Sequence, residues 1–204
     1  MKAGKHRTPR PVGRPSTFDR DAALTEAMLL FWRHGYESTS VVELTEAMKV
    51  KPPKLYAVFG DKKSLFLEAV AKYTSGDITA EGIIASSPTA KDAARTLLTT
   101  AARGFTGDST PSGCLLATSA ISCSTDAEDV RLELAAIRQR IESLLCAKIE
   151  EARERGDVSR DSDALVLASY IMAVIQGMST LARDGASQET LLAVADQSMR
   201  SWPR

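Results

Sequence analysis

The chain of 204 residues is poor in cysteine and has no long apolar run. Its three cysteines, Cys114, Cys123 and Cys146, show no CxxC spacing, which argues against a zinc site or a disulfide framework. An odd cysteine count without an export signal is typical of reduced thiols in the cytoplasm, and a redox role for one of them stays open. No apolar run reaches the roughly 18 residues that span a bilayer, so we expect no membrane segment.

Histidine is also scarce, and the usual catalytic motifs are missing. The only two histidines are His6 and His34, and there is no HExxH, P-loop, nucleophile elbow or cluster of metal ligands. We therefore expect no catalytic residue, no metal and no cofactor. Strand-like alternation of apolar and polar residues does not persist, and glycine is sparse within the periodic segments. The sequence predicts an all-α protein.

The first seventeen residues lack both acidic side chains and a possible core. This segment carries five basic residues and three prolines, so residues 1–17 are predicted to form a disordered basic arm. Gly13-Arg14-Pro15 resembles the centre of an AT-hook, which inserts arginine into a narrow minor groove. The alternative is an inert basic tail. Residues 1–63 hold 12 basic and 7 acidic residues, whereas the remainder holds 14 and 19, so the basic charge gathers at one end.

The segment from Thr39 to Lys63 has the layout of a helix-turn-helix. Ser40 and Glu43 form a capping-box signature at the start of its first helix. Pro52 suits the first position of the second helix, and Leu55 and Phe59 should anchor that helix on the core. Lys54, Tyr56 and Ala57 then point away from the core, toward solvent or a partner. The alternative is a surface helical hairpin without a ligand.

These residues resemble the TetR family of one-component transcription regulators. The resemblance is carried by Gly35-Tyr36-Glu37-Ser38-Thr39-Ser40, Leu44, Val50, Leu55-Tyr56, Phe59-Gly60-Asp61-Lys62 and Leu65-Phe66. It implies that Thr39, Ser40, Tyr56 and Lys62 touch DNA phosphates, and that Lys51, Pro52, Pro53, Lys54 and Ala57 face the bases. It also implies an N-terminal DNA-binding domain, here residues 18–63, and a helical effector-binding and dimerisation domain, here residues 64–204.

Helical periodicity divides the chain into about nine helices. The first is expected over 19–34, followed by the two helices of the motif and a long helix over 61–74. A helix is predicted to begin near Pro88, and a short apolar one to cover 114–123. Thr125 and Glu128 form a second capping-box signature, opening a long helix that ends at Gly156. Two last helices are expected over 162–183 and 187–202.

The penultimate helix has two faces that could make contacts. One is broadly apolar; the other is a stripe of mostly small residues, namely Ser169, Ala173, Gln176 and Thr180. Two such helices from each of two chains would form a four-helix interface, so we expect a homodimer through the last two helices. The alternative is that both faces serve the core of one chain.

The resemblance further implies a pocket for a small-molecule effector within the helical body. The candidate lining residues mix apolar walls with a few polar groups: Phe105, Cys114, Thr118, Tyr170 and Gln176. The expected function is a cytoplasmic, nucleoid-associated repressor that binds a palindromic double-stranded DNA operator as a dimer and is released by its effector. A TetR-like activator and a helical interaction protein that does not bind DNA are the alternatives.

Overall fold

The computed structural model describes residues 18–76, 78–120 and 124–203, and this part of the chain is helical throughout its regular structure. It contains ten α-helices and one short 3₁₀-helix. Their bounds are α1 Arg20–His34, α2 Val41–Ala47, α3 Pro52–Phe59, α4 Lys62–Thr74, α5 Ala80–Ser86, α6 Ala90–Gly104, α7 Leu115–Thr118, η1 Thr125–Ala127, α8 Glu128–Arg155, α9 Ala164–Arg183 and α10 Gln188–Arg200.

Side-chain caps fix where the N-terminal helices begin. The carboxylate of Asp19 accepts hydrogen bonds from two backbone amides at the start of α1. Ser40 and Glu43 form the expected capping box at α2, with both of its hydrogen bonds present. The second capping box, at Thr125 and Glu128, was predicted wrongly. Thr125 lies in η1, no side chain caps α8, and Glu128 pairs with Arg131 instead.

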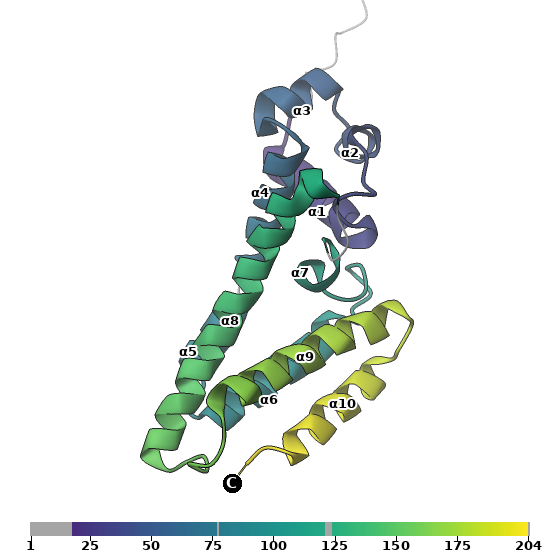
Figure 1. Cartoon of the computed structure of the whole chain (residues 1–204). Helices are drawn as coiled ribbons and strands as arrows, with labels where there is room; N and C mark the ends of the chain where they lie inside the picture. The colour runs from purple at the N-terminus through teal and green to yellow at the C-terminus, as the bar shows by residue number, and fades with distance from the viewer. Residues whose placement is uncertain (1–17, 77, 121–123, 204) are drawn as a thin grey trace, which may run out of the picture.

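The molecule has a helical head and a larger helical body (Figure 1). Helices α1 to α4 form the head. Helix α8 runs from the head to the far end of the body, where α9 turns back beside it. Helices α6, α9 and α10 pack on one another, and α5 lies between α6 and α8. The head, α7 and the upper part of α8 therefore meet at one end of the body helices.

Two hydrophobic cores hold these parts together. The head core unites α1–α4 with α7 and with Val130 and Leu134 near the start of α8. The body core unites α5, α6, α9 and α10 with Leu145, Ile149 and Ala152 near the end of α8. We expected a domain boundary after residue 63, yet the head core continues through α4 to Val70. A single long helix thus contributes to both cores.

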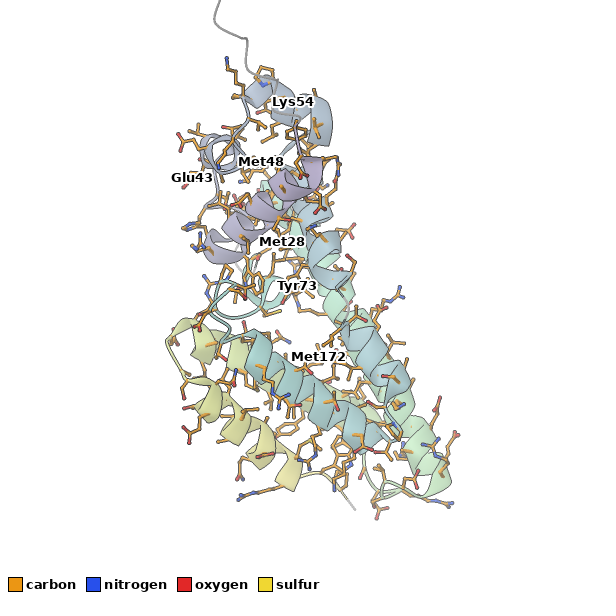
Figure 2. The ribbon with its side chains drawn as sticks, turned by 180° about the vertical axis from the view of Figure 1, so that it is seen from behind. Met28, Glu43, Met48, Lys54, Tyr73 and Met172 are labelled. Carbon is orange, nitrogen blue, oxygen red and sulfur yellow. The ribbon has the colours of Figure 1, made fainter. Side chains whose placement is uncertain are left out.

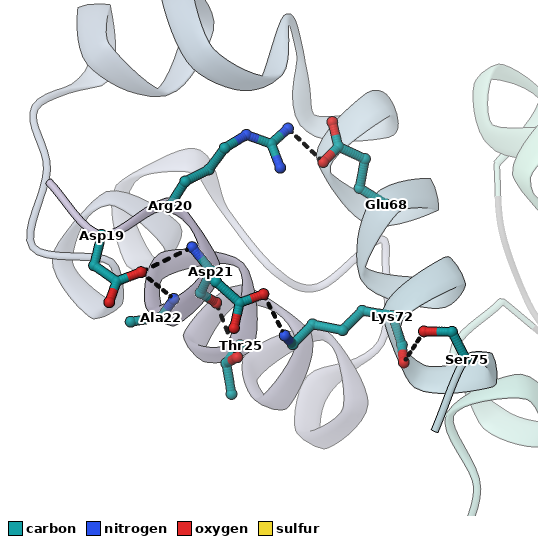
Figure 3. Close-up of polar contacts among 8 residues, drawn as sticks. All are labelled: Asp19, Arg20, Asp21, Ala22, Thr25, Glu68, Lys72 and Ser75. Carbon is teal, nitrogen blue, oxygen red and sulfur yellow. Dashed lines mark hydrogen bonds and ion pairs between the residues drawn. The ribbon is translucent and has the colours of Figure 1, made fainter. Parts of the chain in front are cut away.

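Ion pairs on the surface join α1 to α4 (Figure 3). The Arg20 guanidinium lies 2.6 Å from the Glu68 carboxylate, and Lys72 Nζ lies 2.6 Å from Asp21 Oδ1. Exposed pairs of this kind each contribute only about 0–1 kcal/mol. The buried Phe31–Phe66 contact, with ring centroids 5.0 Å apart, therefore does more to fix the angle between the two helices.

Helix α9 is the most apolar long helix of the described residues. By length and composition alone it could cross a membrane, although 33% of its most apolar window is buried inside the molecule. The remaining apolar surface lies on one side of the helix, where Leu165, Val166, Tyr170 and Leu181 are exposed. The apolar composition of α9 is typical of a helix that buries one face in a core and presents a second apolar face at the surface.

Candidate nucleic-acid interface and effector cavity

Helix α3 presents one buried face and one exposed face. Leu55 and Phe59 are 1% and 3% exposed and anchor the helix in the head core. Tyr56 is 49% exposed. The other residues that we expected to face DNA from this helix and its N-cap are also exposed: Lys51, Pro52, Pro53, Lys54 and Ala57. The opposite faces predicted from the sequence are confirmed, and the outer one is free to enter a groove.

Lys54 on this surface and Lys62 beside it are each held over an aromatic ring. Lys54 Nζ lies 4.9 Å from the centre of the Phe18 ring, and Lys62 Nζ lies 4.5 Å from that of Tyr36. Lys62 also donates a hydrogen bond of 3.3 Å to the Glu37 carbonyl, and partial burial lowers the pKa of its ammonium group. These cation–π contacts orient the lysines without neutralising them, so both charges remain available to a phosphate.

Thr39 and Ser40 are placed differently. Ser40 is exposed at the N-terminus of α2, where its hydroxyl accepts a hydrogen bond from the Glu43 amide. Thr39 is fully buried, and its hydroxyl donates to the Gly35 carbonyl at 2.7 Å. The Thr39 side chain therefore closes the turn after α1 and offers no exposed atom to DNA. This corrects its expected phosphate contact. Arg14 lies outside the described residues.

A cavity of about 640 Å³ lies where the head meets the body. This volume falls within the roughly 300–1,000 Å³ of small-molecule sites. Trp32 of α1 and Tyr73 of α4 belong to the head and line the cavity, as does Met172 of α9. Figure 2 labels Tyr73 and Met172, which lie in the middle of the molecule, away from the recognition helix marked by Lys54.

Tyr73 and Cys114 form a polar pair in the cavity wall. The Tyr73 hydroxyl lies 3.4 Å from Cys114 Sγ, and the Tyr73 ring meets Trp32 edge-on with centroids 4.9 Å apart. Burial raises the pKa of both the phenol and the thiol, so both are neutral at pH 7. Cys114 thus presents a protonated thiol. No group of three or more potential metal ligands occurs within the described ranges.

Three of the five expected effector-site residues line this cavity. Phe105, Cys114 and Gln176 are brought together there, although they come from three separate segments. Thr118 and Tyr170 are absent from the lining. The Thr118 hydroxyl accepts a hydrogen bond from Arg183, and Tyr170 is 41% exposed on the outside of α9. Gln176 lines the cavity and is also exposed, whereas Tyr170 lies on the outer face of α9.

The end of α9 is fastened to the end of α1. Arg183 donates hydrogen bonds of 3.2 and 2.9 Å to the Trp32 and Arg33 carbonyls, which lie in the last turn of α1. Beside it, Gly113 has a φ of +84°, and a Cβ there would lie 2.8 Å from the Ser179 carbonyl oxygen. The Gly113 carbonyl accepts a hydrogen bond from the Trp32 indole at 3.1 Å. Glycine is required here because the loop touches α9 directly.

Comparisons with known proteins show which family this chain belongs to. Residues 23–69 match the model described as bacterial regulatory proteins, tetR family, and residues 90–196 match the Tetracyclin repressor-like C-terminal domain. The chain is 36% identical over 193 residues to the HTH-type transcriptional repressor ComR of Escherichia coli (strain K12), covering 94% of this chain and 92% of ComR. The chain belongs to the TetR family.

Solved structures of TetR-family regulators agree. A cysteine mutant of the regulator CifR, solved in complex with 26-bp double-strand operator DNA, has a TM-score of 0.87 and 38% identity, covering 94% of this chain and all of that one. A TetR regulator from Rhodococcus sp. RHA1 is 36% identical with a TM-score of 0.61, covering 91% of this chain and all of the other. The all-α fold with an N-terminal helix-turn-helix is thereby confirmed.

Sequence reasoning missed several cavity residues of this TetR-family protein. Trp32, Tyr73 and Arg138 line the cavity, but each lies on a helix whose periodicity marks only its buried face. The sequence offered one signal for Trp32 and Tyr73. Each carries a polar group, an indole N–H or a hydroxyl, among otherwise apolar neighbours. Arg138 gave a weaker signal, as a cation adjoining the apolar stripe of α8. The missed residues come from α1, α4 and α8, which meet at this site.

Proposed function

We propose that this protein is a ligand-responsive transcriptional repressor that binds a palindromic operator as a dimer and leaves it when a small molecule fills the cavity. The observation that carries the proposal is the position of the cavity. Its wall includes Trp32 of α1 and Tyr73 of α4, and both helices belong to the head core in which the recognition helix is anchored. A ligand in this cavity touches the DNA-binding head directly.

The outer face of α3 supports the DNA-binding half of the proposal. Lys51, Pro52, Pro53, Lys54 and Ala57 would face base edges in the major groove, and Ser40, Tyr56 and Lys62 would contact phosphates. Arg14 would enter the adjacent minor groove. Phosphate contacts position such a protein, and base contacts specify its sequence. The protein would then be a cytoplasmic, nucleoid-associated regulator with no catalytic activity.

The outer face of α9 supports the dimer. Of nine large hydrophobic side chains that are exposed in the described residues, α9 carries four. Ala173, Gly177 and Thr180 lie among them and are also exposed, so a second helix could approach closely. Two copies would place two α3 helices one turn of DNA apart, about 34–36 Å, which a palindromic operator requires.

The coupling of ligand to DNA follows from these contacts. A ligand shifts the equilibrium only if it binds the DNA-free conformation more tightly. By moving Tyr73 or Trp32, a bound molecule would rotate α4 and α1 relative to α9, which holds the partner. The spacing of the two recognition helices would then depart from one turn of DNA.

Selection of DNA fragments from a random pool tests the proposal. The full chain should enrich a palindromic sequence, and gel-shift titration should show affinity that falls steeply with salt. If the chain retains no fragment even at low salt, it does not bind DNA and the helical interaction protein is favoured instead.

Repression is then separated from activation with a reporter gene. The selected operator is placed over the polymerase site, and transcription should fall when the protein is present. An increase in transcription would identify an activator. Ala57→Arg places a bulky side chain on the outer face of α3 and serves as a variant that folds but should not read the operator.

A further inference from the structure

Three charged side chains of the described residues line the cavity, and they differ in how they are paired. These are Glu81, Arg138 and Arg140. Arg140 Nε lies 2.8 Å from Glu81 Oε1, and both side chains are largely exposed, so they neutralise each other at the solvent edge. Arg138 belongs to none of the ion pairs found in the described ranges. Among the described residues, the cavity therefore holds one cation without a countercharge.

The position of Arg138 makes this charge available to a ligand. Its Nη1 donates a hydrogen bond to the Leu116 carbonyl, which is neutral. A guanidinium group has five N–H donors, so most of them remain for another acceptor. The side chain is only partly exposed, and burial together with the positive charge of Arg131 lowers its pKa. A cation in a largely apolar wall is stabilised by any anion that enters.

We propose that the effector is an organic anion whose carboxylate, sulfonate or phosphate head group binds the Arg138 guanidinium while an apolar body fills the cavity. This inference rests on the proposed function, because it takes the cavity as the effector site. Apolar walls such as Ile141 and Met172 suit the body. The planar guanidinium fork suits a head group with two oxygens in one plane. A neutral carbonyl would accept the same hydrogen bonds but leave the charge uncompensated.

Binding of matched probes to the full chain, without DNA, tests the inference. Decanoate, decanesulfonate and decyl phosphate are compared with decan-1-ol, and 4-phenylbutyrate with 4-phenylbutan-1-ol, all below their aggregation limits. Trp32 lines the cavity, so its fluorescence reports binding. At least one anion should bind about tenfold more tightly than its alcohol, as expected for a charge-assisted hydrogen bond. The tightest head group then names the class.

Variants of the two arginines identify the residue responsible. Arg138→Gln should abolish the preference for the anion, whereas Arg140→Gln, the control at the edge of the same cavity, should keep it. Arg138→Lys retains the charge and should retain most of the preference, which separates lost charge from lost folding. The inference is overturned if no anion in the wild-type protein binds more tightly than its alcohol. It is equally overturned if the preference survives in Arg138→Gln.

These outcomes are independent of the DNA-binding result. Anion binding measured by Trp32 fluorescence needs no operator, so a chain that selects no DNA would end the proposed function and leave the ligand class standing. Conversely, a chain that selects an operator but shows no anion preference would keep the regulator and lose the anionic effector.

Discussion

Lys54 and Tyr56 lie two residues apart in the sequence but should act on DNA in different ways. Lys54→Ala should weaken binding to the preferred operator by about 1–3 kcal/mol if the ammonium group reads a base, and should weaken all sequences alike if it contacts only phosphate. Tyr56→Phe removes one hydroxyl and should weaken all sequences to a similar extent. Gel-shift titration of operator and scrambled DNA measures both effects.

The matched control is Lys91→Ala, which removes an exposed lysine from the start of α6, outside the head. Its affinity should equal that of the wild-type protein at the same salt concentration. Unchanged affinity in both Lys54→Ala and Tyr56→Phe, with normal circular dichroism, would contradict the assignment of α3 as the recognition helix.

Asp61 should stabilise α4 in a pH-dependent way. Its carboxylate accepts a hydrogen bond of 2.7 Å from the Ser64 amide, and this bond lowers the pKa of Asp61 below its ordinary value. Asp61→Ala should reduce the free energy of unfolding by about 1 kcal/mol at pH 7, as for other lost N-caps. Because the folded pKa is the lower one, this contribution is complete above the unfolded pKa of about 4. It is lost as the pH falls through the folded pKa.

Urea unfolding at pH 7 and at progressively lower pH measures this dependence. The stabilities of the wild-type protein and Asp61→Ala should converge in acid. Asp61→Asn is the control, since an asparagine side chain also caps a helix without titrating. A difference between wild type and Asp61→Ala that stays constant across the pH range would show that the carboxylate is not what stabilises α4.

At the scale of helices, Arg183 connects α9 to α1. Its hydrogen bonds to the Trp32 and Arg33 carbonyls also place a positive charge at the C-terminal end of α1, which the helix dipole favours. Arg183→Met keeps an unbranched apolar stem but removes the guanidinium group and these bonds, so it should lower the free energy of unfolding by about 1–2 kcal/mol. It should also weaken the response of DNA binding to a cavity ligand. Denaturant titration and ligand-dependent gel shifts measure the two effects.

Arg103→Met is the comparison, because Arg103 is an exposed arginine in the last turn of α6. It should leave both quantities unchanged. If Arg183→Met behaves like Arg103→Met, α9 communicates with the head by another route.

The helices of the head were predictable from the sequence because their caps are local. Asp19, Ser40, Asp61 and the prolines of α3 mark each N-terminus within a few residues, and the observed bounds follow them. Helix α5 was missed because it has only seven residues and carries Gly82 in its first turn. The short apolar segment near Cys114 was expected to be longer than the four residues of α7.

The cavity could not be derived in the same way. It forms where the head packs on the body, so its lining depends on angles between helices that no local pattern fixes. Thr118 illustrates the difficulty, since it lies one residue from the lining residue Ala117 yet bonds to Arg183. Thr39 shows a related limit. The hydroxyl of a threonine in a turn can be buried in a structural hydrogen bond or exposed to a phosphate, and the residue type alone does not distinguish the two.

At the scale of the whole molecule, we predict that the outer face of α9 forms the dimer. Ala173→Arg should raise the dissociation constant of the dimer at least about tenfold, because a buried unpaired charge is costly. Helix α9 should stay folded, since Ala173 is exposed in the single chain. Analytical ultracentrifugation measures the change. Ala85→Arg, at an exposed site on α5, is the control, and equal dissociation constants for the two variants would place the dimer elsewhere.

The basic arm should act on the salt dependence of DNA binding. Removing residues 1–11 together with Arg14→Ala deletes five basic side chains, so fewer counterions are released and the slope of affinity against salt should flatten. The loss should be greatest where A·T-rich steps flank the operator, because their minor groove is narrow. Gel shifts over a range of salt concentrations measure the slope. Equal slopes for the full and shortened chains would show that the arm takes no part.

The sharing of α8 between the two cores restricts how such a chain can recombine with its relatives. Val130 and Leu134 complete the head core from beyond α7, so a gene fusion that joins this head to a foreign body at residue 63 would leave its apolar underside without these partners. A working chimera has to exchange α4, α7 and the first half of α8 together. Exchange of the whole head between related proteins is therefore harder than the order of the segments along the chain suggests. Recognition of a new operator should evolve more readily by substitution on α3.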